Sequence, residues 1–211
     1  MTTLIFVRHG QSEANVNNIY AGFLDAELTE LGKEQAERTA EYIVKNYKID
    51  KIYSSDLKRA YSTAMAVANK IGLEIITDKR LREINGGNWE GKLFDSLRGT
   101  KEYELWLSDI GNSACVGGES VKQLQERIVC EIEKIISENN GKTVLIATHA
   151  TPIRVMQCAF SGAALDEMKN IPWVSNASVT VVCAEDGRYD FKLISYDKHL
   201  GDMKTVLPSN V

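Results

Sequence analysis

The sequence predicts an α/β layered domain, because short buried strands alternate with amphipathic helices along the chain. Two apolar runs, residues 4–7 and 143–148, have the composition of strands that are buried on both faces. Apolar residues at helical spacing occupy much of the chain between these runs. The length of 211 residues fits one domain, residues 1–211, with a sizeable core.

Three helices are predicted from apolar residues that share one face. Thr29 is the expected N-cap of the first helix, Ser55 or Asp56 of the second and Ser120 of the third. The three apolar faces consist of Ala36, Ala40, Ile43, Val44 and Tyr47, then Leu57, Ala60, Ala64, Val67, Ala68 and Ile71, and finally Val121, Leu124, Ile128, Ile132 and Ile135.

Further strands are predicted before the second helix and near the C-terminus. Residues 51–54 have the pattern of a short strand. Residues 178–183 and 189–195 flank a turn at residues 185–187 and therefore resemble a hairpin.

The segment from about residue 89 to 118 fits the alternation least well, because it is rich in glycine around one short helical piece near residues 103–107. We expect it to form a cap-like insert over the sheet. Its large side chains, Leu93, Phe94, Tyr103 and Trp106, are candidate pocket walls. Packing of the insert onto the domain explains them at least as well.

Charge and cysteine content exclude several classes of partner and location. The chain has 25 basic and 29 acidic residues, a net charge of −4, which gives no general field for attracting nucleic acid or an anionic membrane. Cys130, Cys158 and Cys183 lie among apolar residues and are expected to be reduced and buried. With no signal peptide or long apolar segment in the sequence, a cytoplasmic location is expected.

The triplet Arg8-His9-Gly10 follows the first buried run, and α/β proteins bind ligands at the carboxyl ends of such strands. Arg8 offers a forked donor for phosphate oxygens, and a neutral His9 can be nucleophilic. Gly10 would let the backbone turn sharply and approach a ligand. An isolated histidine at a strand end is more typical of a core histidine that is satisfied by a backbone carbonyl, but Arg8 beside His9 weakens that explanation.

His149 ends the second apolar run, so the two imidazoles would meet if the two strands are neighbours. Two histidines and a carboxylate also suggest a metal site. Arg8 would repel a cation and favour an anion, so zinc is the weaker alternative.

Two more residues suit an anion site. Arg59 lies in the first turn of a predicted helix, where the free amides and the positive helix end favour negative charge. Glu83 has apolar flanks and could act as an acid. A solvated helix face and a surface charge, respectively, are the ordinary explanations for such residues.

Taken together, these motifs closely resemble the histidine phosphatase superfamily, which includes the cofactor-dependent phosphoglycerate mutases. The order and spacing of the segments carry the resemblance, which spans most of the chain. The matching segments are residues 4–15, 28–32, 35–36, 54–60, 81–83, 117–120, 148–149, 176–179 and 199–200.

The resemblance implies a three-layer αβα sandwich with a mostly parallel sheet, and hydrolysis of a phosphate ester without a metal or another cofactor. His9 would attack phosphorus and become a phosphohistidine, while Glu83 protonates the leaving oxygen and later takes a proton from water. Arg8, Arg59 and His149 would hold the phosphoryl oxygens.

The resemblance also assigns substrate-binding positions and favours one branch of the family. Asn15 and Gly22 match positions that line the phosphate pocket, and Ala150 stands where the family usually has glycine. Mutases carry basic residues after the glutamate, whereas residues 84–89 here contain none. Residues 89–91 instead resemble the phosphatase branch, so a phosphatase that acts on a small phosphate ester is preferred.

Two alternatives remain open from the sequence. One is a cofactor-dependent phosphoglycerate mutase, and the other is a non-catalytic phosphate-binding or regulatory protein of the same fold. No cysteine has an arginine six positions later, so a cysteine phosphatase is unsupported. The oligomeric state and the individual ester cannot be predicted.

Overall fold

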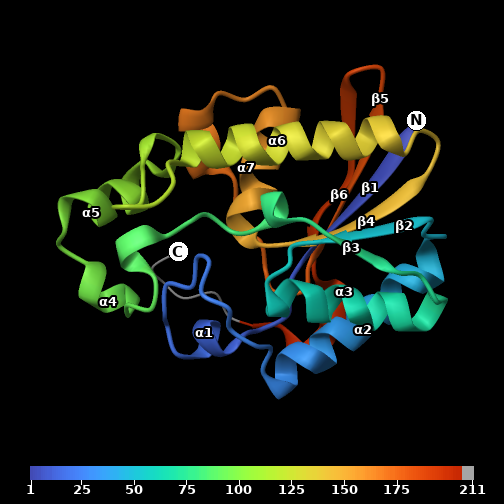
Figure 1. Cartoon of the computed structure of the whole chain (residues 1–211), viewed down its shortest axis with the longest axis horizontal. Helices are drawn as coiled ribbons and strands as arrows, with labels where there is room; N and C mark the ends of the chain where they lie inside the picture. The colour runs from blue at the N-terminus through green and yellow to red at the C-terminus, as the bar shows by residue number, and fades with distance from the viewer. Residues whose placement is uncertain (206–211) are drawn as a thin grey trace.

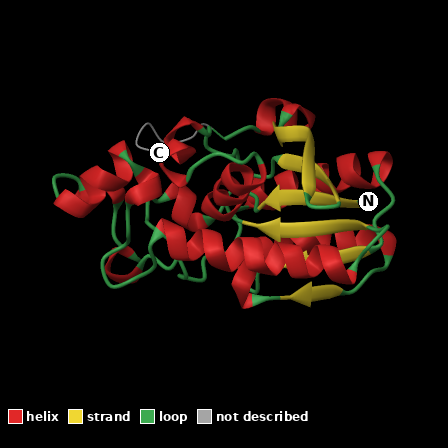
Figure 2. Ribbon diagram, turned by 90° about the horizontal axis from the view of Figure 1, so that it is seen from above, coloured by secondary structure: helices red, strands yellow, loops and turns green. Residues whose placement is uncertain are grey.

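The computed structural model describes residues 1–205 and has three layers, with a sheet between two groups of helices (Figures 1 and 2). The strands are β1 (Thr2–Arg8), β2 (Lys51–Ser54), β3 (Ile75–Thr77), β4 (Thr143–Thr148), β5 (Val179–Glu185) and β6 (Arg188–Tyr196). Their order in the sheet is β3-β2-β4-β1-β5-β6. The first four in this order are mutually parallel, whereas β5 and β6 add an antiparallel hairpin. The predicted sandwich with a mostly parallel sheet is confirmed.

Helices cover both faces of the sheet, because successive residues of a buried strand point to opposite sides. The helices are α1 (Glu13–Val16), α2 (Glu30–Asn46), α3 (Lys58–Ile71), α4 (Phe94–Leu97), α5 (Lys101–Ser108), α6 (Val121–Glu138) and α7 (Ala150–Phe160). Ile5 and Val7 of β1 pack with α2 and α3 on one face. Leu4 and Phe6 pack with α6 and α7 on the other face.

Two of the three predicted helix caps are present. The Thr29 side chain caps α2, and Ser120 forms a capping box at the start of α6. The prediction for α3 was wrong: the N-cap is Leu57, without a side-chain cap bond, and neither Ser55 nor Asp56 fills that role. The Ser55 hydroxyl instead lies between the Leu57 amide and a histidine of the candidate site, as described below.

Four of the helices and strands, α1, β3, α4 and α7, were not predicted from the sequence. α1 and α4 have only four residues each. β3 has only three residues at the sheet edge, too few for a periodic pattern. The α7 segment carries a helical pattern, with polar Thr151, Arg154 and Gln157 at intervals of three, but all of its residues except Ala159 are buried. The segment from about 89 to 118 contains α4 and α5, and α5 includes the predicted helical piece.

The four cysteines are free thiols, and their burial differs in part from the prediction. Cys158 is buried and Cys183 is partly buried, but Cys130 is exposed. The prediction for Cys130 was wrong because this position faces away from the apolar stripe of α6. Within residues 1–205, no helix combines the length and the apolar character that crossing a membrane requires.

The loop after β1 presses directly on the first turn of α2 through two glycines. A Cβ atom on Gly10 would lie 2.3 Å from the Gly32 carbonyl oxygen. A Cβ atom on Gly32 would lie 1.9 Å from the Gln11 carbonyl oxygen. Both contacts are far inside van der Waals distance and involve backbone, so neither position has room for a side chain.

Gly32→Ala is therefore expected to lower the free energy of unfolding by about 1–3 kcal/mol, the usual cost of overpacking. Helix propensity alone predicts the opposite sign, a gain of about 1 kcal/mol, because Gly32 lies inside α2. Urea denaturation of the two proteins measures the difference. Glu34→Ala, at an exposed position of the same helix, is the control and should change stability little; a more stable Gly32→Ala protein would contradict the steric argument.

Candidate active site

The parallel pairing of β1 with β4 brings the two histidines together. Arg8 is in register with Thr148, so His9 and His149 follow at the same edge of the sheet. Their ring centroids are 5.1 Å apart, with the rings at 63° to each other. The sequence predicts that the two imidazoles meet if their strands are neighbours. The structure shows that the strands are neighbours and that the imidazoles do meet.

His9 is held so that one ring nitrogen is free to react. The side chain is buried, and Nδ1 lies 2.7 Å from the carbonyl oxygen of Gly10. A carbonyl oxygen only accepts, so Nδ1 carries the proton and Nε2 keeps its lone pair. Burial, reinforced by the charges of Arg59 and Arg8, holds the pKa of His9 well below its usual value. The ring is therefore neutral near pH 7, as a nucleophile must be.

The backbone of His9 is fixed from both sides. Its amide donates to the Thr148 carbonyl at 3.0 Å, and its carbonyl accepts from the Ala177 amide at 3.1 Å. The side-chain amide of Asn176 donates to the same carbonyl at 3.2 Å. The next amide, that of Gly10, donates to the Thr63 hydroxyl at 3.1 Å. These bonds tie the loop to β4, α3 and the segment before β5, so the imidazole has a rigid support.

His149 is the N-cap residue of α7 and is fully buried, so it contacts His9 without itself lining the cavity. Its Nε2 is 2.9 Å from the Ser55 hydroxyl. Its Nδ1 has no hydrogen-bond partner within the described part of the chain. Burial, followed by the charge of Arg59, lowers the pKa of His149 well below its usual value. His149 is therefore a neutral ring with one nitrogen not yet engaged.

Arg8 and Arg59 are buried guanidinium groups without a carboxylate partner. Arg59 donates to the carbonyl oxygens of Leu24 and Gly22, each at 2.8 Å. Arg8 donates to the carbonyl of Val174. In residues 1–205 neither arginine forms an ion pair, and the Nε of each has no partner.

Burial lowers the pKa of both Arg8 and Arg59 to about 10, so each keeps its charge at neutral pH. The negative charge of Glu83 raises both pKa values, but Glu83 forms no ion pair with either arginine, and a buried positive charge without a contacting counterion is unfavourable. An anion bound between the two groups would offset that cost and would use the free Nε donors.

Glu83 lines the same cavity from the segment after β3. Its Oε1 accepts from the amide of Ile84 at 2.9 Å, and its Oε2 accepts from the amide of Thr151 at 3.4 Å. The carboxyl group is only partly buried. It is therefore held at the cavity wall with room to exchange a proton.

The three remaining positions assigned from the family also border the cavity. Oδ1 of Asn15 accepts from the Ser12 amide at 3.0 Å and from the Asn176 side chain at 3.1 Å, so its NH2 group is left to donate. Gly22 has a φ of +49°, and a Cβ there would lie 2.4 Å from a carboxylate oxygen of Glu90. Ala150 begins α7, where the helix dipole favours anions.

The outer part of the cavity is mostly apolar and was only half predicted. Phe94 and Trp106 line it, as expected, but Leu93 is exposed at 53% and Tyr103 is buried against Trp89. Walls that sequence reasoning missed are Ile19, Tyr20, Ile84 and Trp173. Including its open mouth, the cavity has a volume of about 730 Å³.

Two missed residues support the site from outside the cavity. Ser55, which the sequence predicts as a helix cap, contacts His149 instead. Asn176 belongs to the family-like segment 176–179, and its side-chain amide donates to the His9 carbonyl and to Asn15. Among the residues that the structure describes, no three His, Cys, Asp or Glu side chains form a candidate metal site, so the zinc alternative has no donor set there.

Comparison with known proteins agrees with this arrangement. The model of the histidine phosphatase superfamily (branch 1) matches residues 4–197. Phosphoserine phosphatase 1 of Hydrogenobacter thermophilus is 33% identical over 204 residues, which are 96% of each chain. The structure of YhfR from Bacillus stearothermophilus superposes with a TM-score of 0.90 at 30% identity, covering 95% of this chain and all of the other.

A second solved structure is the mycobacterial glucosyl-3-phosphoglycerate phosphatase in complex with VO3. It superposes with a TM-score of 0.84 at 28% identity, covering 91% of this chain and 98% of the other. Several relatives are thus named phosphatases, which agrees with the predicted metal-independent phosphomonoester hydrolase. By the extent of the family match and the identity to its relatives, the chain belongs to the histidine phosphatase superfamily, branch 1.

Proposed function

We propose that this protein hydrolyses phosphate monoesters of small organic alcohols, with His9 as the residue that carries the phosphoryl group. The observation that supports this most is a neutral Nε2 of His9 beside the buried guanidinium groups of Arg8 and Arg59, which form no ion pair within residues 1–205. A nucleophile beside two buried positive charges at one edge of a sheet suits an electrophile that carries negative charge, as a phosphate ester does.

In the first step, Nε2 of His9 forms a bond to phosphorus while the ester P–O bond breaks. The leaving oxygen takes the proton of the Glu83 carboxyl group. The imidazole ring then carries the phosphoryl group on Nε2 and the proton on Nδ1, so it becomes positive. The Gly10 carbonyl, 2.7 Å from Nδ1, stabilises that charge.

In the second step, water attacks phosphorus and the N–P bond breaks, returning the electron pair to Nε2 of His9. The Glu83 carboxylate takes a proton from the water, which restores the starting state. In both steps the phosphoryl oxygens are held by Arg8, Arg59 and His149. Further donors are the Asn15 side chain and the amide of Ala150.

The cavity walls favour an uncharged leaving group. Phe94, Trp106 and Trp173 stand around the space that the ester's organic part would fill. Among residues 1–205, those that line the cavity include no lysine, and no arginine besides Arg8 and Arg59. A phosphoglycerate mutase needs a second anion site, and this lining offers none, so hydrolysis is preferred to mutase activity.

We further propose a cytoplasmic protein whose partner is a small phosphate ester rather than nucleic acid or a membrane. Four cysteines without a disulfide fit a reducing compartment. The net charge of −4 provides no field for polyanions.

A substrate panel tests the function and separates it from the alternatives. We expect kcat/KM for 1-naphthyl phosphate to exceed that for phosphoserine or 3-phosphoglycerate by roughly tenfold or more, since a buried carboxylate without a partner costs at least 1–3 kcal/mol. Phosphate release and phosphoglycerate interconversion are measured on the same preparation. Faster interconversion than release would favour a mutase, and binding of phosphate without turnover of any ester would favour a non-catalytic protein.

A further inference from the structure

Glu83, the proposed acid, stands on a segment without regular secondary structure. Residues 83–86 belong to no helix or strand, so no helical turn or sheet ladder fixes the backbone beneath this side chain. Proton transfer needs the carboxyl group within hydrogen-bond reach of the leaving oxygen. Other residues must therefore hold the backbone of this segment in place.

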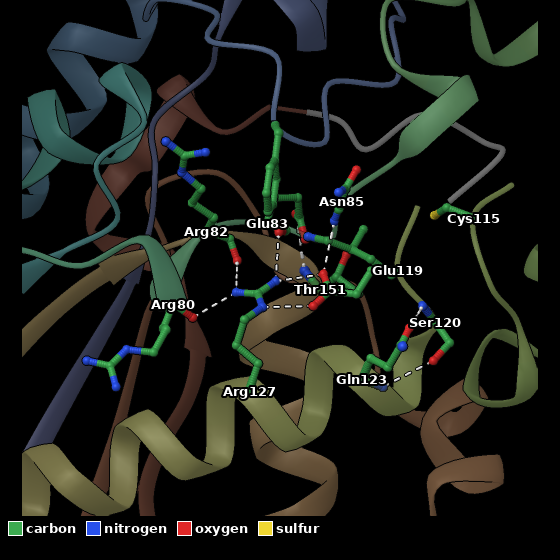
Figure 3. A network of polar contacts seen from close by, with 12 residues as sticks. Arg80, Arg82, Glu83, Asn85, Cys115, Glu119, Ser120, Gln123, Arg127 and Thr151 are labelled. Carbon is green, nitrogen blue, oxygen red and sulfur yellow. Dashed lines mark hydrogen bonds and ion pairs between the residues drawn. The ribbon is translucent and has the colours of Figure 1, made fainter. Parts of the chain in front are cut away.

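Arg127 of α6 supplies this support with all of its donors (Figure 3). Its Nη1 donates to the carbonyl oxygens of Arg80 at 2.7 Å and Arg82 at 3.1 Å. Its Nη2 donates to the carbonyl oxygen of Glu83 itself at 3.0 Å. The remaining donors, on Nε and Nη2, bind the two carboxylate oxygens of Glu119, each at 2.8 Å. A guanidinium group has five N–H donors in a fixed plane, and each of the five has one acceptor here.

Glu119 completes the contact from the other end of the segment. Its Oε2 accepts from the amide of Asn85 at 3.1 Å, and its own amide donates to the Asn85 carbonyl at 2.9 Å. The Arg127 and Glu119 side chains are only 18% and 15% exposed. A bidentate, largely buried pair of this kind is rigid, unlike an exposed ion pair.

We infer that Arg127 and Glu119 are positioning residues for the Glu83 carboxyl group: they hold residues 80–85 so that this group meets the leaving oxygen. This inference rests on the proposed function. Neither side chain lines the cavity, so neither touches the substrate. They act through the backbone, and a misplacement of about 1 Å can lower a rate by roughly 10²-fold.

The test compares two esters that differ in their need for a proton. An alkoxide leaving group, as in 2-phenylethyl phosphate, must be protonated, whereas 2,4-dinitrophenolate leaves without one. For Arg127→Gln we expect kcat/KM to fall by roughly 10²-fold with the alkyl ester and by less than about threefold with the dinitrophenyl ester. Arg127→Lys, with three donors instead of five, should fall in between.

The ratio of the two kcat/KM values is the decisive quantity, because a misfolded fraction of the sample cancels from it. Glu119→Gln provides a second variant, whose ratio should shift in the same direction. Lys134→Gln is the matched control, because it removes a positive charge from the same helix. Lys134 pairs with Glu131 and Glu138, so it reaches the 80–85 segment only indirectly, through Glu131. Its ratio should equal that of the wild type.

The outcomes separate this inference from the proposed function. An unchanged ratio in active Arg127→Gln and Glu119→Gln proteins would overturn the positioning role alone, because a merely structural role lowers both rates equally. Absence of wild-type turnover with both esters would overturn the proposed function and this inference with it.

Discussion

His9→Ala is expected to lower kcat by roughly 10⁴-fold or more, because the covalent route through phosphohistidine is lost entirely. Arg8, Arg59 and Asn15 remain, so the variant should still bind inorganic phosphate with an affinity close to that of the wild type. Loss of turnover with retained binding identifies a nucleophile, whereas loss of both would indicate a collapsed site. Phosphate release and isothermal calorimetry measure the two quantities.

The chain offers a matched control, since it contains only three histidines. His199 lies outside the cavity, where its ring stacks on Tyr42 and its Nε2 is 2.9 Å from the Thr39 hydroxyl. His199→Gln should therefore keep most of its activity. Rapid quenching of the wild type during turnover should yield a phosphoryl group that is stable in base, labile in acid and located on the His9 peptide. Equal turnover by the wild type and His9→Ala would contradict the mechanism.

The sequence predicted the helices that have one polar and one apolar face and the strands that are buried on both faces. α2, α3 and α6 follow from their stripes, and β1 and β4 follow from apolar runs. α7 was not predicted, although Thr151, Arg154 and Gln157 recur in it at helical spacing. These polar side chains are buried with the apolar ones, so α7 differs from α2, α3 and α6 in having no exposed polar face.

The centre of the site was easier to predict than its walls. His9 and His149 each end a buried strand, and the parallel pairing of β1 with β4 places both ends at one edge. Trp173 reaches the cavity from a stretch without a predicted element, so only the folded chain reveals it. Tyr103 and Trp106 lie on the same short helix, but only Trp106 lines the cavity.

The roles of hydroxyl and ion-pair residues were the hardest to predict. Ser55 stands where a cap is typical, yet the packing of β2 beside β4 gives its hydroxyl to His149. Arg127 and Glu119 have the composition of ordinary surface residues on and before a helix. Arg127 donates to backbone carbonyls 44 to 47 positions away, and Glu119 accepts from a backbone amide 34 positions away, which no spacing rule reports.

Glu83→Gln is expected to separate the two half-reactions. The amide keeps the size of the side chain and can still accept from the Ile84 amide, but it neither donates an acidic proton nor accepts one as a base. With 2-phenylethyl phosphate, kcat/KM should fall by roughly 10²–10⁴-fold, the usual contribution of a general acid. This loss sets the upper limit for the smaller effect expected from Arg127→Gln.

With 2,4-dinitrophenyl phosphate the first step of Glu83→Gln needs no proton and should stay fast, whereas attack of water on the phosphohistidine loses its base. Stopped-flow absorbance should then show a burst of dinitrophenolate close to one equivalent per active site, followed by slow turnover. The phosphorylated His9 should accumulate and be visible as an intact-protein mass increase of one phosphoryl group. A steady rate without a burst, together with equal losses on both esters, would mean that Glu83 transfers no proton in either step and that another group does so.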